Sequence, residues 1–197
     1  AQAQLVGMLS DDRNNPTLTE LETAFSVDAV TKQFYKDYRD QFEKLWNELN
    51  DIVEKDLKIS EEFTNQTIDT ANFAKKLMGQ IVFLYFLQKK GWLGVGKDSD
   101  GNFKDWGTGP KNFLRRLYDK EFTDYGNFFN DVLEPLFYEA LATERTSDVF
   151  TQFNCKIPFL NGGLFEPIND YNWEETDIRI DNDIISGVLD TFDQYNF

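Results

Sequence analysis

The sequence of 197 residues is long enough for one domain with its own apolar core, and its 19 Phe, 8 Tyr and 4 Trp indicate a folded chain. It has no histidine and a single cysteine, Cys155, which excludes a Ser–His–Asp triad, an ordinary zinc site and an internal disulfide, and favours the reducing cytoplasm. The net charge of −15 argues against a chain that coats DNA phosphates with its whole surface.

The N-terminal part of the chain is predicted to hold a long surface helix. Residues 1–24 show little pattern, and we expect them to be the trailing end of an upstream domain or a linker, ahead of a helical domain over 25–197. A helix is predicted to begin with Ser26 as its N-cap, and apolar residues recur at three- and four-residue steps as far as Val53. Its opposite face is charged, so it is expected to lie across the outside of the domain. A polar break is expected at 58–66.

The centre of the domain is predicted to be a helix over about 70–90. Its second half, 81–87, is apolar all round but far too short to span a membrane. Gly91 is expected to end the helix as a C-terminal cap, with Lys89 and Lys90 at the negative end of the helix dipole. The predicted fold is therefore mainly α, an irregular helical bundle around this central helix.

The rest of the chain is predicted to alternate loops and shorter helices. A glycine-rich loop is expected at 91–110, with a short hairpin around Asp100-Gly101. Helices are then expected at about 111–121, 124–143 and 182–193, and a short strand could form at 177–180.

Two segments approximate ligand-binding motifs but fail in detail. The stretch from Gly91 to Asp98 has the glycine and lysine spacing of a phosphate-binding P-loop, but Asp98 stands where a Ser or Thr should hold magnesium, and a helix precedes it instead of a strand. A calcium loop starting at Asp98 would need glycine where Phe103 stands. No spacing singles out a pair of carboxylates either. We therefore predict no catalytic, cofactor-binding or metal-ligating residue in this chain.

Residues 73–120 differ from the rest of the chain in charge, with ten basic and four acidic residues. One interpretation is a solvated basic face that balances acidic neighbours within the fold. The other is contact with the DNA backbone, for which we single out five side chains. These candidates are Lys89, Lys90, Lys111, Arg115 and Arg116.

A second notable segment lies between 158 and 165. Pro158 fixes the entry to a turn at Asn161-Gly162-Gly163, where two glycines allow positive φ and close backbone approach. Apolar residues on both sides should pin the turn. We therefore interpret Pro158, Asn161, Gly162 and Gly163 as a tight, buried structural turn.

Read as Pro-Phe-Leu-Asn-Gly-Gly-Leu-Phe followed by Glu166, this segment resembles the fused restriction–modification DNA methyltransferases, large single-chain type II enzymes of bacteria. In that family a proline-led segment of this kind lies just ahead of the methyltransferase domain. Residues 25–38 are similar to the family's helix after the nuclease domain, 83–93 to its core helix, and 192–197 to its lead-in to the methyltransferase. The resemblance covers about 25–197.

The resemblance implies a parent that methylates adenine in DNA with S-adenosylmethionine and carries a magnesium-dependent nuclease. This chain has no Pro-Pro pair for the family's methylase loop and no recognisable nuclease motif, so no catalytic residue is carried over. It would be the non-catalytic helical connector, with the two flanking domains as partners and DNA as a partner through the parent enzyme. The alternative is a protein–protein scaffold that never contacts nucleic acid.

Overall fold

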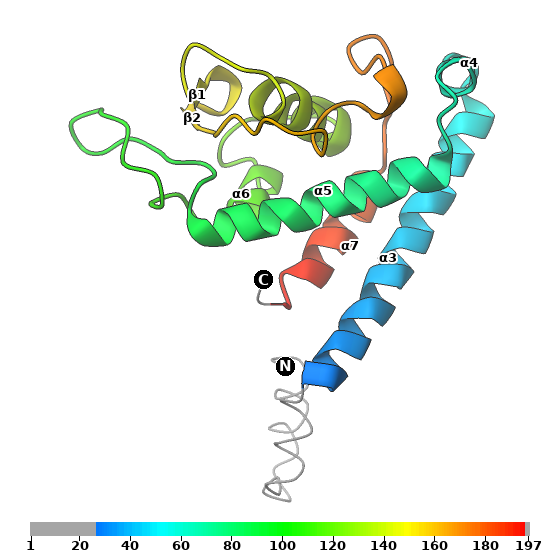
Figure 1. Cartoon of the computed structure of the whole chain (residues 1–197), viewed down its shortest axis with the longest axis horizontal. Coiled ribbons are helices and arrows are strands. Elements are labelled where there is room, and N and C mark those ends of the chain that lie inside the picture. Colours follow the sequence, from blue (N-terminus) through cyan, green and yellow to red (C-terminus); the bar gives the residue numbers. More distant parts are fainter. Residues whose placement is uncertain (1–26, 196–197) are drawn as a thin grey trace, which may run out of the picture.

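A computed structural model describes residues 27–195 (Figure 1). The expected N-cap at Ser26, and the division at residue 24, lie outside the described residues. Within them the fold is mainly α, as predicted, with one two-stranded sheet. No helix in the described part of the chain is long and apolar enough to cross a membrane.

The predicted long helix is α3, Val27–Lys55. Its C-terminal half enters the core through Leu45 and Leu49, which are fully buried, whereas most of its remaining residues are exposed or half-buried. Its N-terminal half packs on the last helix, because the rings of Phe34 and Tyr38 each lie 6.1 Å from that of Phe192. The long helix therefore lies along one side of the domain with only part of its apolar stripe covered.

The polar break expected at 58–66 is wrong, because residues Leu57–Asn65 form helix α4. The Asp56 side chain caps its first turn by accepting hydrogen bonds from the backbone N–H groups of Lys58 and Ile59. Ile59 and Phe63, one turn apart, are buried beneath it. Glu62 also accepts a hydrogen bond of 2.8 Å from the N–H of Asn172, so apolar and polar contacts together hold this short helix on the core.

The central helix is α5, Thr70–Lys90, as predicted. It begins with Asp69, whose carboxylate accepts a hydrogen bond from the N–H of Asn72, and it ends at Gly91 in the left-handed conformation, with φ 71°. One side of the helix is buried, but Phe83 on the other side is 39% exposed. In Figure 1, α5 meets α3 at the end where α4 lies, and the two helices diverge from there.

The second half of the chain departs from the prediction at several boundaries. The hairpin in the 91–110 loop is present as a bridge between Lys97 and Phe103. Helix α6 covers only Phe113–Tyr118, because the chain turns away at Lys120, whose φ is +60°. No strand forms at 177–180; the sheet instead pairs β1, Val149–Phe150, with β2, Cys155–Lys156. Short 3₁₀ segments follow at Thr151–Phe153 (η3) and Ile168–Asp170 (η4), and the last helix is α7, Asn182–Phe192.

The helix predicted at 124–143 is shorter than expected, and its hydrogen bonding is mainly π-helical instead of α-helical. It forms two consecutive π-helical stretches, η1 at Phe129–Leu133 and η2 at Pro135–Leu141. Pro135 has no N–H to donate, so an α-helical hydrogen bond is unavailable at that position. Glu134, between the two stretches, is fully buried.

Glu134 is a carboxyl group held in an apolar environment. Its Oε1 atom accepts a hydrogen bond of 2.8 Å from the hydroxyl of Tyr171, and its Oε2 atom has no hydrogen-bond partner among the described residues. Burial raises the pKa of Glu134 to about 9. The folded chain therefore keeps this side chain protonated at neutral pH.

We expect Glu134 to make the protein less stable as the pH rises from about 4.5, its ordinary pKa, to about 9, its pKa in the folded chain. In that window the unfolded chain releases the proton and the folded chain retains it. Glu134→Gln should therefore exceed the wild type in unfolding free energy at pH 8 by on the order of a few kcal/mol, and by little near pH 4.5. Urea unfolding at pH 4.5, 6.5 and 8 measures this. If the unfolding free energies of the wild type and the variant changed with pH in the same way, the buried Glu134 would not be the cause.

Candidate nucleic-acid interface

Three of the five predicted contacts gather where α5 ends. Lys89 and Lys90 are exposed in its last turn, and Lys111 is exposed two residues before α6. The Lys111 Nζ atom lies 3.4 Å from the carbonyl oxygen of Gly107. A Cβ atom at Gly91 would lie only 2.6 Å from the same Nζ, so this ammonium stands beside the end of α5. Lys89, Lys90 and Lys111 are called the lysine cluster below.

Backbone contacts around Gly91 hold the lysine cluster together. The Gly91 carbonyl oxygen accepts hydrogen bonds from the N–H groups of Gly107, at 3.1 Å, and Gly109, at 3.0 Å. The loop thus folds back onto the end of α5 and delivers Lys111 there. The N–H of Leu114 donates to the buried side chain of Gln88 on α5, which fixes the start of α6. The carbonyl end of a helix favours cations, so three lysines are tolerated in this position.

The two arginines of α6 have carboxylate partners within the domain. Arg115 makes ion pairs with Asp190, at 2.6 Å, and Asp193, at 2.9 Å, both at the end of α7. Arg116 pairs with Glu121 at 2.6 Å. No ion pair joins any member of the lysine cluster to a described carboxylate. The five predicted contacts thus fall into two groups. The three lysines have no carboxylate partner among the described residues, whereas the two arginines tie α6 to nearby carboxylates.

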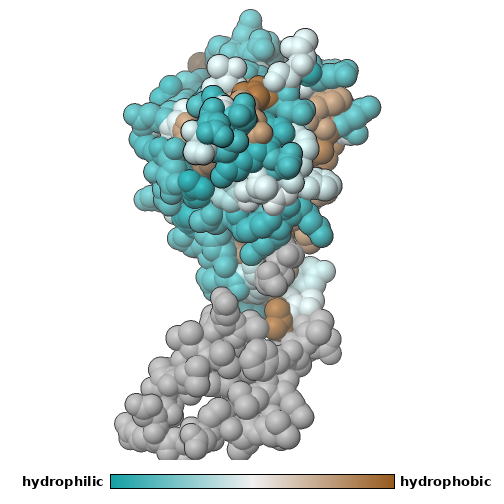
Figure 2. Space-filling model, turned by 90° about the vertical axis from the view of Figure 1, so that its left-hand side faces the viewer, coloured by the Kyte–Doolittle hydropathy of each residue, from teal (hydrophilic) through white to brown (hydrophobic). Residues whose placement is uncertain are grey.

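The structure adds a basic residue and two aromatic ones that the sequence did not indicate. Lys156 of β2 bridges to Val95 in the 91–110 loop, and its Nζ atom donates a hydrogen bond to the carbonyl oxygen of Lys104. The same Nζ lies 4.6 Å from the ring centre of Trp106, which is 38% exposed, and Trp92 is 46% exposed. Figure 2, which views the side where this loop projects, shows a largely hydrophilic face.

The turn that contains Pro158, Asn161, Gly162 and Gly163 is present, but its expected burial is wrong. Asn161 and both glycines are exposed, and Pro158 is half-buried. Neither glycine has a positive φ, and a Cβ atom on Gly162 would meet nothing within 4 Å. No constraint within the described residues therefore requires glycine at these positions.

Side chains of α5 and one apolar anchor hold the turn in place. The Nζ atom of Lys76 donates to the carbonyl oxygen of Gly163 at 3.0 Å, and Gln80 donates to that of Leu164 at 2.9 Å. Phe165 is buried, with its ring centre 5.9 Å from that of Phe83 and 5.6 Å from that of Phe137. The turn is therefore fixed to the outside of the central helix.

The described residues do not assemble a metal-binding group. Among them, no three or more Asp, Glu, Cys or His side chains are placed to hold a metal ion. The Asp98 carboxylate instead accepts hydrogen bonds from the backbone N–H groups of Asp100 and Asn102, which is the geometry of a turn.

Comparison with known proteins relates this chain to a restriction–modification protein. No protein-family model matches the sequence, and no solved structure matches it. The chain is 31% identical over 192 residues to a protein of Methanocaldococcus jannaschii named "Putative type II restriction enzyme and methyltransferase", and the match covers 85% of this chain and 14% of that protein. A helical region with a basic edge is thus similar to a small part of a much longer protein. The chain thus spans about one seventh of the length of this relative.

The geometry at Gly91 predicts a large effect of adding one methyl group. In Gly91→Ala the Cβ atom would lie 2.3 Å from the Gly107 carbonyl oxygen, at a φ of 71° that alanine rarely adopts. We expect a loss of unfolding free energy on the order of 1–3 kcal/mol, measured by urea unfolding. Gly96→Ala is the matched control, because its Cβ would meet nothing within 4 Å. Equal stability of the two variants would show that Gly91 does not hold the loop.

Proposed function

We propose that this chain is a non-catalytic helical connector of a restriction–modification DNA methyltransferase, where it positions the methyltransferase and nuclease domains. The observation that carries the proposal is the similarity to a protein named as both restriction enzyme and methyltransferase, which covers most of this chain but 14% of that protein. The catalytic machinery of such a protein needs the remaining length. S-adenosylmethionine and magnesium would accordingly bind in the flanking domains.

A connector must keep its shape while the domains on either side work. The described part of the chain has a continuous apolar core that involves all of its longer helices. Side-chain hydrogen bonds add long-range ties, such as that from Tyr85 of α5 to Asp193 after α7, at 2.8 Å. Burial and these ties support a single rigid unit.

The lysine cluster is the part of this unit best suited to contact DNA. Lys89, Lys90 and Lys111 would attract phosphates by charge and would not read bases, because an ammonium group on a flexible stem is a point charge. The arginines are less suited, since each would have to leave a carboxylate partner at 2.6 Å. We therefore propose the three lysines as the principal phosphate contacts, and Arg115 and Arg116 chiefly as internal ties.

A protein–protein scaffold without DNA contact is the second candidate function. Two observations favour it: the net charge of −15, and the neutralisation of both α6 arginines within the domain. In this case the exposed lysines would only solvate the end of α5. The two candidates differ in one measurable quantity, the salt dependence of DNA binding.

We expect the protein to bind a 30-base-pair duplex weakly and independently of sequence, and replacement of Lys89, Lys90 and Lys111 by Ala to weaken that binding. Each lost phosphate contact should lower the slope of log affinity against log salt by ~0.9. Fluorescence anisotropy measures the affinity and the salt slope. The titrations run from about 20 to about 200 mM salt, where phosphate contacts are sensitive to salt.

The matched control removes three exposed lysines of α3, Lys32, Lys36 and Lys44. If this control reduces affinity and slope as much as the cluster variant does, binding is a general charge effect. If the cluster variant changes neither quantity, the lysine cluster does not contact DNA and the scaffold function is favoured. Arg115→Ala should lower stability and leave the salt slope unchanged, because its charge is used within the domain.

A further inference from the structure

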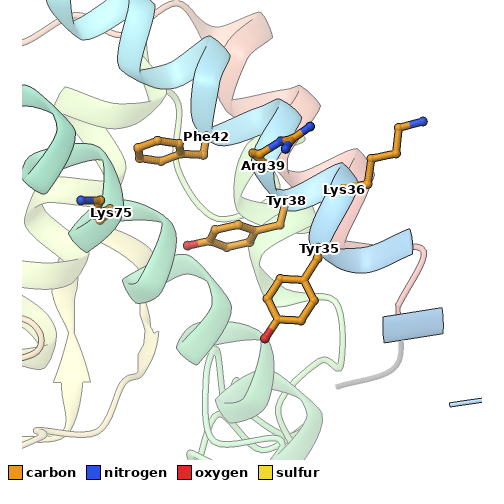
Figure 3. Close-up of a pocket in the computed structure, with 6 residues that line it drawn as sticks. All are labelled: Tyr35, Lys36, Tyr38, Arg39, Phe42 and Lys75. Carbon is orange, nitrogen blue, oxygen red and sulfur yellow. The ribbon is translucent and has the colours of Figure 1, made fainter. Parts of the chain in front are cut away.

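An apolar groove lies between α3 and α5, at the opposite end of α5 from the lysine cluster. Its volume is about 540 Å³, and the side chains of Tyr35, Tyr38, Phe42 and Lys75 line it together with Lys36 and Arg39. Figure 3 shows the three aromatic rings in a row along α3, with Lys75 across from them on α5. Tyr35 is 68% exposed, which is unusual for a large ring beside other large rings.

The charges around this groove have one sign. Lys36, Arg39 and Lys75 belong to its lining and no carboxylate does, although the chain as a whole carries a net charge of −15. In Figure 3 the ends of Lys36 and Arg39 reach away from the rings, so the floor is apolar and the charge lies at the rim. Arg39 has one close carboxylate, Glu43, at 3.6 Å in an exposed pair that contributes little.

A glycine within α5 lies one helical turn from the groove residue Lys75. Gly79 lies one turn after Lys75 on the same helix face, and a Cβ atom there would meet nothing within 4 Å. Glycine inside a helix costs about 1 kcal/mol relative to alanine. The absence of a side chain at this point lets another backbone approach α5 closely.

We propose that this groove receives an amphipathic helix with acidic residues beside its apolar face, supplied by a flanking domain of the longer protein. That this helix comes from a flanking domain rests on the proposed connector function. That it is amphipathic and acidic rests on the groove alone. An apolar helix face fits between two diverging helices and covers the rings of Tyr35, Tyr38 and Phe42. Acidic residues at its edges meet Lys36, Arg39 and Lys75.

The packing of the rings favours a helix over a single strand of nucleic acid. Single strands bind by stacking their bases on free aromatic faces. One face of Tyr38 already stacks on Phe192 and one face of Phe42 on Trp46, so few faces are left for bases. A helix places its acidic side chains outside its apolar stripe, where the rim cations are.

The test uses the whole 197-residue chain and a synthetic helical peptide of about five turns with leucines on one face and glutamates beside them. Gly79→Leu should weaken peptide binding by at least about tenfold, or ~1.4 kcal/mol. A helical side chain covers the turn N-terminal to its own Cα, so the introduced leucine side chain would lie over Lys75 and into the groove. The variant should fold at least as well as the wild type, because leucine favours helix more than glycine does. Gly79→Ala is the matched control and should retain binding.

The same peptide with lysines in place of glutamates, and a short oligothymidine, are the comparison probes. Binding of the acidic peptide alone, sensitive to Gly79→Leu, supports the inference. Equal binding of the basic peptide, preferential binding of the oligonucleotide, no binding of the acidic peptide, or self-association abolished by Gly79→Leu would each overturn it.

Amide hydrogen exchange tests the source of the helix separately from its chemistry. Exchange over 35–42 should be slower in the longer protein than in this chain, and Gly79→Leu should remove the difference. If the peptide binds but exchange over 35–42 is equally fast in both proteins, the helix does not come from a flanking domain. That result would also count against the connector function. Because neither assay contains duplex DNA, both are independent of the lysine cluster.

Discussion

The left-handed conformation of Gly91 is the constraint on which the basic edge of this protein depends. With φ at 71°, the chain leaves α5 in a direction that lets the Gly91 carbonyl oxygen accept two hydrogen bonds from the far end of the glycine-rich loop. Those bonds close the loop, and its closure places Lys111 beside Lys89 and Lys90. A residue with a Cβ atom cannot occupy this position without displacing Gly107. The charge pattern of the surface is thus determined by a backbone conformation.

The parts of the fold that sequence could predict are those stabilised by neighbours in the chain. Helix α5 has a capping aspartate, an apolar segment and a terminal glycine, and its bounds were predicted closely. Helix α4 was missed because only two of its residues, Ile59 and Phe63, face the core, and its polar composition dominates the pattern. The strand expected at 177–180 has suitable residues, but no neighbouring strand lies beside it in the described part of the chain. Pairing depends on tertiary structure that a local pattern does not contain.

The candidate interface shows the same division. The basic residues could be counted from the sequence, but their availability could not. Arg115 meets Asp190 and Asp193, which lie more than 70 positions later in the chain, and this contact removes its charge from the surface. Lys156 reaches the basic edge through a bridge to Val95 that no sequence window would join. Which cations are free is therefore a property of the folded domain.

The contact between Tyr195 and Asp37 has a consequence for how a connector would work. The Tyr195 hydroxyl donates a 2.5 Å hydrogen bond to Asp37, and the ring of Tyr195 packs on Phe34 with the centres 5.0 Å apart. The beginning of α3 and the end of the described chain are therefore side by side, as Figure 1 also shows. A polypeptide that enters and leaves a rigid unit at one place follows a hairpin path. Domains attached at these two points would be neighbours, and the body of the connector would project to one side of them.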